Sequence, residues 1–281
     1  MKQGIVIESN KAYHSYREAI SKSRLEKMSV CPSYFKWCED NPQEPNEDLI
    51  LGSAFHKLVL EPQDFDKEFI IIEKFDRRTK EGRLAYEHQM QLVQSGMQVI
   101  TQEQYDTICG MRDSVYNNKY AKVLLDGNIE QSFYFKDDFT EEECKCRPDV
   151  WKKLKNGRVL IVDLKSTKSS KTEDFVRDVV KFGYDLQDFH YTYGVSKVLE
   201  TPKDNIDFIF IAVEKKPPYL CNILQADDLI RQRGETLFRE YIGKYHECKE
   251  SGVWYGLNGA FDVINNLSLP SYLVEKENKG E

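Results

Sequence analysis

The order of predicted helices and strands indicates an α/β protein, with a β-sheet flanked by helices and a helical N-terminal elaboration. Three observations carry this prediction. Residues before 127 read mainly as helix, aromatic and apolar strand-like runs dominate 129–167, and helices alternate with a further apolar run after that. The 281 residues are 40% hydrophobic and 31% charged, which is ordinary for a globular chain long enough to bury a sizeable core.

The N-terminal part is predicted to be mainly helical. Residues 14–40 form a helical opening that Pro32 interrupts, and 41–48, rich in proline and acidic residues, form a loop. Apolar residues recur with helical spacing over 50–60. The range 73–126 is polar and helix-prone throughout.

From residue 127 onwards strands and helices follow one another. Thr172, followed by two acidic residues, is a favourable helix start, and 206–213 is a near-continuous apolar run typical of a buried strand. The tail after Leu273 is charged and expected to be loose. Strands are predicted over 129–135, 144–154, 158–167, 206–213 and 219–224, and helices over 172–183, 184–199 and 226–250.

Cysteine usage and charge narrow the class of protein. The seven cysteines are irregularly spaced without a CxxC pair, which indicates reduced thiols in a cytosolic protein and disfavours disulfides, structural zinc and iron–sulfur clusters. A net charge of −7 argues against a nucleic-acid coat but permits a local basic groove. No apolar run is long enough to span a membrane, and the first ten residues do not resemble a secretory signal.

The segment that carries chemistry is Arg147-Pro148-Asp149, with Asp163 and Lys165 following it. Carboxylate oxygens suit a hard divalent cation, which polarises a phosphodiester. Because side chains alternate along a strand, Lys165 shares a face with Asp163 and could orient the attacking water or offset phosphate charge. The alternative is that both aspartates are surface carboxylates and Lys165 is their salt-bridge partner.

The hairpin between the two aspartates must have a particular loop length for a metal site to form. A two-residue turn at Asn156-Gly157 would place Asp149 opposite Leu164, so the two aspartates would point to opposite faces. A three-residue loop, with Gly157 in the left-handed conformation, places Asp149 directly opposite Asp163. We predict the three-residue loop, with Leu160, Val162 and Leu164 packed against the core on the other face.

Two further polar elements accompany this hairpin. Gln187 and Tyr191 are four residues apart on one helical face, with Tyr184 one turn earlier, and could bond phosphates or the water shell of a metal. His56 lies among apolar neighbours on a helix and could be a metal ligand or a phosphate contact. The alternatives are the polar edge of a core helix for the first pair and a hydrogen-bonded core histidine for His56.

Taken in order, these elements resemble the RecB-like branch of the PD-(D/E)xK nuclease superfamily. The shared pattern is GxxxH, then PD, then DxK, then QxxxY, and over 12–215 the chain is similar to RecE-like exonucleases, the exonuclease VIII family. The residues that carry the resemblance are Gly52 and His56, Pro148-Asp149, Asp163-Leu164-Lys165, Gln187 and Tyr191, with ISKSRL at 20–25, CPSYF at 31–35 and LGSAFHKLVLEP at 51–62.

The resemblance implies a restriction-endonuclease-like core, with a central mixed β-sheet, and a set of roles. Asp149 and Asp163 would bind Mg²⁺, for which Mn²⁺ would substitute, with His56 and Glu130 as additional ligands. Lys165 would assist the attacking water. Gln187 and Tyr191 would support the site and contact DNA, and Arg147, Lys168 and Lys171 are expected to bind DNA. The basic residues could equally form a solvated hairpin surface.

The domain organisation follows from the same resemblance. We expect one nuclease domain over 1–281, with a mainly helical part at 12–126 carrying His56, a catalytic core at 127–225, and a C-terminal helix and tail at 226–281. The resemblance implies hydrolysis of linear duplex DNA from its ends, 5′ to 3′, in phage-type recombination. It further implies a ring-shaped homo-oligomer in the cytoplasm of a bacterial or phage-infected cell, working beside a RecT-type annealing protein.

Three other functions remain open. The chain could be a different RecB-like nuclease, such as an endonuclease; a Cas4-like protein is disfavoured because the late cysteine cluster is missing. It could be a catalytically silent DNA-binding descendant, although such proteins commonly lose a carboxylate or the lysine. A metal-dependent phosphatase is conceivable but lacks the histidine-rich signature of that class.

Overall fold

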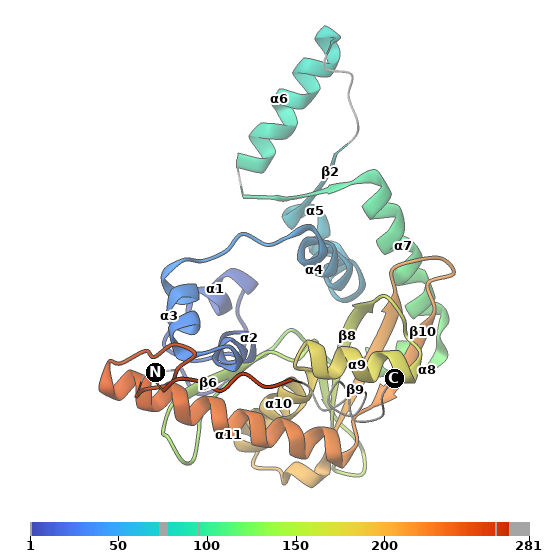
Figure 1. Cartoon of the computed structure of the whole chain (residues 1–281). Coiled ribbons are helices and arrows are strands. Elements are labelled where there is room, and N and C mark those ends of the chain that lie inside the picture. The colour runs from blue at the N-terminus through green and yellow to red at the C-terminus, as the bar shows by residue number, and fades with distance from the viewer. Residues whose placement is uncertain (1, 73–77, 95, 262, 270–281) are drawn as a thin grey trace, which may run out of the picture.

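The structure is a computed structural model that describes residues 2–72, 78–94, 96–261 and 263–269. Helices surround a central mixed sheet in this part of the chain (Figure 1), as the α/β prediction requires. The charged tail after Leu273 lies outside the described residues. Among the described residues, no helix combines the length and the apolar character needed to cross a bilayer.

The central sheet has five strands in the order β10-β9-β8-β7-β4. The long strands β8 and β9 lie side by side and parallel, while every other neighbouring pair in this sheet is antiparallel. Helices α9 (Thr172–Lys181) and α10 (Tyr184–Leu199) connect β8 to β9, as a parallel pair requires. The strands are β4 (Asn128–Ile129), β7 (Val150–Lys153), β8 (Val159–Thr167), β9 (Ile206–Glu214) and β10 (Cys221–Gln225).

Strand β8 is buried on both faces. Val159 and Ile161 belong to a hydrophobic cluster with α10 and α11 (Asp228–Ser251). Leu160, Val162 and Leu164 belong to a second cluster with α4 (Glu47–Leu60) and α7 (Gln102–Asn117), which confirms the predicted core face. Side chains at odd positions of β8 therefore face α10, where Asp163 and Lys165 continue the series beyond the apolar part.

Two smaller sheets flank the centre. Strands β1 (Gly4–Val6), β5 (Ser132–Lys136) and β6 (Glu143–Cys146) form an antiparallel sheet. Strands β2 (Phe69–Ile72) and β3 (Gln98–Thr101) pair in parallel at the base of α6 (Lys80–Gln94), which projects away from the rest of the protein (Figure 1). The remaining short helices are α1 (Asn10–Ser15), α2 (Lys22–Leu25), η1 (Glu26–Ser29), α3 (Pro32–Asp40), η2 (Pro62–Asp64), α5 (Phe65–Glu68), α8 (Lys119–Leu124) and η3 (Lys203–Asn205).

Several predicted boundaries were wrong. The strand predicted over 129–135 is divided between β4 and β5, because Glu130 adopts a left-handed backbone with φ of 51°. The strand predicted over 144–154 is divided between β6 and β7, and Pro148, which cannot donate a ladder hydrogen bond, lies at the division. Pro32 begins α3 rather than interrupting a helix, and β2 and β3 were missed.

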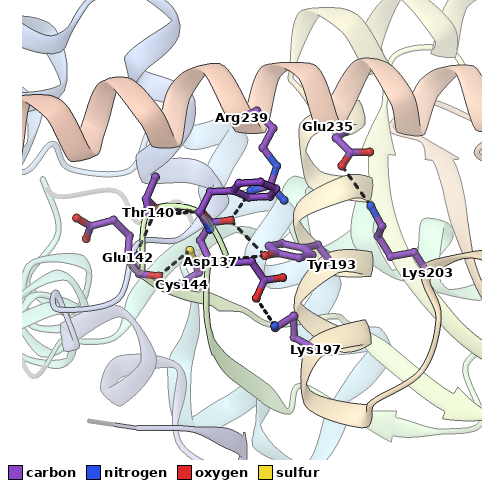
Figure 2. A network of polar contacts seen from close by, with 11 residues as sticks. Asp137, Thr140, Glu142, Cys144, Tyr193, Lys197, Lys203, Glu235 and Arg239 are labelled. Atoms are coloured by element: carbon purple, nitrogen blue, oxygen red, sulfur yellow. Dashed lines mark hydrogen bonds and ion pairs between the residues drawn. The ribbon is translucent and has the colours of Figure 1, made fainter.

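A polar network fastens α11 to the turn between β5 and β6 (Figure 2). Asp137 is fully buried and accepts hydrogen bonds from the Thr140 N–H at 2.9 Å and the Tyr193 hydroxyl at 3.2 Å, and it pairs with Arg239 of α11. Burial raises the pKa of Asp137, but hydrogen bonds from Thr140 and Arg239 lower it by more, so the net shift is downward. Glu142 adds an ion pair with Lys249, also on α11, at 2.6 Å. The network thus joins α10, α11 and the β5–β6 turn.

The contact between α10 and α11 leads to a prediction about Gly234. A Cβ atom at Gly234 would lie 2.0 Å from the backbone oxygen of Asp185 and 3.0 Å from the Cβ of Phe189. We expect Gly234→Ala to lower the free energy of unfolding by about 1–3 kcal/mol, measured by denaturant titration, because a backbone atom cannot easily give way. A Cβ at Gly243 of the same helix meets open space, so Gly243→Ala should stabilise by about 0.5–1 kcal/mol. Equal effects of the two substitutions would contradict this packing.

A second prediction concerns His190, which is fully buried on α10. Its Nε2 lies 3.0 Å from the Lys145 carbonyl, and its Nδ1 has no hydrogen-bond partner among the residues that the structure describes. Burial lowers the pKa of His190 to about 4, against 6.5 in the unfolded chain. The folded state therefore excludes the proton, and about 3 kcal/mol of stability, present above pH 6.5, should be lost as the pH falls towards 4. Unfolding measured between pH 4 and 7 should show a flatter profile for His190→Gln than for the wild type; parallel profiles would refute this assignment.

Candidate active site

The two aspartates lie opposite each other at the end of the β7–β8 hairpin. The Leu154 N–H donates to the Arg158 carbonyl at 2.7 Å, and Gly157 between them has φ of 83°. This is the three-residue loop that the sequence predicts, and the strand register agrees with it. Continued by one residue, that register places Asp149 opposite Asp163.

Hydrogen bonds fix the orientation of both carboxylates. Oδ2 of Asp149 accepts from the backbone N–H of Leu164 at 2.6 Å, which holds this carboxylate beside β8. Oδ1 of Asp163 accepts from the Gln187 side-chain amide, and Oδ2 pairs with the Lys165 ammonium. Asp149 and Asp163 are only 8% and 2% exposed. The predicted aspartates, lysine and glutamine are thus brought together at one point.

The charges of this group influence one another. Burial raises the pKa of Asp149, but His56 and Lys165 lower it by more. Burial and the nearby Asp149 raise the pKa of Asp163, against the opposing effect of Lys165. Burial lowers the pKa of Lys165, but Asp163 raises it by more, so the ammonium is retained. Two carboxylates beside one lysine create a negative potential that a cation would offset.

Two more predicted ligands reach Asp149 from other parts of the chain. His56 of α4 places Nδ1 3.3 Å from Asp149 Oδ2, and the N–H of Glu130 donates to the Asp149 carbonyl at 3.1 Å. Burial and the nearby Asp149 raise the pKa of Glu130 to about 7. Burial lowers the pKa of His56, but Asp149 raises it by more. Ligand atoms of His56, Glu130 and Asp149 all lie within 4.8 Å of one another.

These residues fit a hard divalent cation. Carboxylate oxygens and one imidazole nitrogen are suitable donors, and their mutual distances allow a shared ion. Asp163 is not in that group of three. Its Oδ2 is buried and pairs with the Lys165 ammonium, and like any carboxylate oxygen it has more than one lone pair. An oxygen of this kind has capacity left for a ligand.

An open cleft of about 1050 Å³ leads to this group. One wall comes from the N-terminal segment before α1, another from α4, and a third from the segment after β8. The lining includes His56, Glu130, Arg147, Lys168 and Tyr184. The cleft therefore connects solvent to two of the predicted metal ligands, His56 and Glu130.

The predicted DNA-contacting residues occupy different positions. Lys168 is exposed and lines the cleft, whereas Lys171 is exposed at the start of α9 and does not line it. Arg147 lines the cleft but is 8% exposed, with Nε 3.7 Å from Glu130 Oε2 and its guanidinium donating to the Glu8 carbonyl. Arg147 therefore also holds the N-terminal segment against the site.

On α10, the tyrosine nearest to the lysine is not the one predicted. Tyr191 packs against Phe208 with a ring distance of 6.2 Å and does not line the cleft. Burial raises the pKa of Tyr191, with Tyr13 and Asp163 adding to the shift, so its hydroxyl remains within electrostatic reach of the site. Tyr184 does line the cleft, and its ring centroid lies 4.7 Å from the Lys165 ammonium. Tyr184 lies one turn before Gln187 on the same helical face, as the spacing in the sequence predicts.

Fold and site together define a class of α/β proteins in which an aspartate directly before one strand lies beside an aspartate and a lysine of the next strand. Here these are Asp149 before β7, and Asp163 and Lys165 on β8. Residues 21–266 match the family described as "PDDEXK-like domain of unknown function (DUF3799)", and the chain belongs to this family.

One solved structure shares the fold. The crystal structure of a "Putative exonuclease" from Eubacterium rectale is 15% identical, covers 96% of this chain and 98% of its own, and has a TM-score of 0.63. The crystal structure of SSO0001 is 10% identical, covers 84% of this chain and 80% of its own, and has a TM-score of only 0.36. No curated protein matches the sequence significantly.

The ligand group predicts that divalent cations stabilise the protein without DNA. We expect Mg²⁺ or Mn²⁺ to raise the melting temperature. At a concentration 100 times the dissociation constant, the ion should add about 2.7 kcal/mol to the free energy of unfolding. Asp149→Asn should remove this shift, because Asp149 is central to the group. The matched control is Asp48→Asn, an exposed carboxylate that lines the same cleft and pairs with Lys215 at 2.7 Å. A shift retained in Asp149→Asn but lost in Asp48→Asn would place the cation elsewhere.

Proposed function

We propose that this protein is a metal-dependent deoxyribonuclease. The observation that carries the proposal is the register of the hairpin, which sets Asp149 opposite Asp163 with Lys165 on the same face, while His56 and Glu130 beside Asp149 line an open cleft. Membership of the PDDEXK-like family supports the same reaction class. A solvated pair of surface carboxylates is a poor alternative, because both aspartates are more than nine-tenths buried.

Each side chain has a proposed role. Asp149, Asp163, His56 and Glu130 would hold Mg²⁺, or Mn²⁺ in its place, and the bound ion would polarise the scissile phosphate. Lys165 would orient the attacking water and offset charge that develops on the phosphate. Gln187 keeps Asp163 in place through its amide hydrogen bond, and Tyr191 would support the same group from α10.

The preferred substrate is the end of linear double-stranded DNA, degraded 5′ to 3′ as in RecE-like exonucleases. The motifs of the sequence support this choice, and the structural relative from Eubacterium rectale is described as a "Putative exonuclease". The cleft is lined by Lys168 and Arg147, which would contact phosphates, and the exposed Lys171 follows Lys168 along the chain. Open duplex ends are the substrates that such a chain would meet during phage-type recombination.

The proposal extends to the assembly and its setting. The chain would act as a single nuclease domain over 1–281, with its helical part at 12–126, its core at 127–225 and its C-terminal helix and tail at 226–281. It would form a ring-shaped homo-oligomer around DNA in the cytoplasm. A RecT-type annealing protein would take up the single strand that it produces.

A cleavage assay tests the activity and its polarity together. Linear duplex DNA labelled separately at each end would be incubated with the protein and Mg²⁺ or EDTA, beside covalently closed circles. We expect the 5′ label to be released first, only with Mg²⁺, and circles to survive. Asp163→Ala should reduce cleavage by at least about 100-fold, because it removes an oxygen donor and the Lys165 partner. The exposed Asp113→Ala on α7 should cleave like the wild type.

Other outcomes of this assay would redirect the assignment. Cutting of closed circles would indicate an endonuclease of the same branch. Early loss of the 3′ label would reverse the polarity. Intact DNA with both metals, together with retained DNA binding, would replace catalysis by the DNA-binding alternative.

A further inference from the structure

A second lysine approaches the site from α2. Lys22, the first residue of α2, donates from its ammonium to Glu26 at 2.8 Å and to the backbone carbonyl of Phe182 at 2.7 Å. Its side chain is 12% exposed. Phe182 lies directly after α9, where helix carbonyls lack partners within the helix, and the ammonium satisfies one of them. Lys22 therefore ties the N-terminal part of the chain to the turn between α9 and α10.

The turn leaves no room for a side chain beside this pair. Gly183 has φ of 60°, and a Cβ there would lie 2.7 Å from Glu26 Oε1 and 3.3 Å from the Lys22 ammonium. The carbonyl of Gly183 accepts the first α10 hydrogen bond, from the N–H of Gln187, at 3.0 Å. The position of the Lys22–Glu26 pair thus determines where α10 begins and how it is rotated.

The first turn of α10 carries two side chains that hold the catalytic group. Tyr184 is packed between Phe175 and Phe210, with ring centroids 5.9 Å away in both cases, and presents its ring to the Lys165 ammonium at 4.7 Å. Gln187, one turn later, donates to Asp163. A rotation of α10 would move both contacts at once.

Lys22 also lies near the same ring and the same charges. Its ammonium lies 6.0 Å from the Tyr184 centroid. Burial lowers the pKa of Lys22, and Lys165 lowers it further while Glu26 and Asp163 raise it, so Lys22 lies within electrostatic reach of the site. Because its ammonium already bonds Glu26 and the Phe182 carbonyl, Lys22 is placed to act through the turn rather than on DNA.

We propose that Lys22 is a positioning residue that acts through the Phe182 carbonyl and the turn at Gly183. It holds the Tyr184 ring against the Lys165 ammonium, and it holds Gln187 against Asp163. The inference rests on the proposed nuclease function, because the reaction that it assists is strand cleavage. In this proposal Tyr184 acts through the face of its ring, which attracts the Lys165 ammonium, and not through its hydroxyl.

Steady-state cleavage by six variants tests this role. Lys22→Met, which keeps the chain length but removes the charge, should lower kcat about tenfold while KM for DNA stays within about twofold. Lys22→Arg should recover most of kcat. Tyr184→Leu should be as slow as Lys22→Met, and the double variant no slower, while Tyr184→Phe should resemble the wild type. Lys36→Met, which breaks a similar but exposed i,i+4 pair with Asp40, is the matched control and should change neither constant.

Hydrogen exchange supplies a readout that needs neither DNA nor metal. Lys22→Met should speed exchange of the amides at 183–190, where Gln187 bonds Gly183, and leave α11 unchanged. Unchanged exchange there would overturn the proposal, as would a raised KM with normal kcat, which would make Lys22 a DNA contact. If the wild type cleaved no DNA, the proposed function would fail. Faster exchange in that case would still support control of the turn by Lys22, and unchanged exchange would overturn it.

Discussion

The site depends on the register of one hairpin. A loop shorter by one residue would turn Asp149 towards the face of Leu164 and separate the two carboxylates. The register is enforced from both sides, because β8 is buried between two hydrophobic clusters and a slip would place apolar side chains in the wrong cluster. The packing of apolar residues thus fixes the relative positions of the charged ones, and Gly157 permits the loop that both require.

The charged group is costly to bury and is compensated locally. Asp163 and Lys165 lie together in the interior, where loss of hydration opposes folding even for a good pair. Gln187 and the backbone N–H of Leu164 supply the hydrogen bonds that make the burial tolerable. Glu130, with a left-handed backbone and a raised pKa, is a further strained element beside the same group. These buried charges and the strained backbone lower the free energy of unfolding, and a cation bound beside them would raise it again.

Much of this arrangement could be predicted from the sequence, for reasons that are local. The apolar alternation of 160–164 and the glycine at 157 are sufficient to set the register, and helical spacing places Gln187 and Tyr184 on one face. The division of strands at Glu130 and Pro148 could not be predicted, because it reflects pairing with different sheets. Lys22 was not identified either: its partner is a backbone carbonyl 160 residues away, and a carbonyl has no sequence signature.

The residues of the site are widely separated along the chain, from Lys22 to Gln187, and β8 gains its parallel neighbour only with β9. During synthesis on the ribosome, an emerging chain that ends before β9 would hold the two aspartates without the full sheet that buries them. Every ligand residue would be present, but β8 would lack its parallel neighbour and α10 would have no finished surface to pack on. The site would therefore become ordered only after β9 has been made, although every residue that forms it is synthesised earlier.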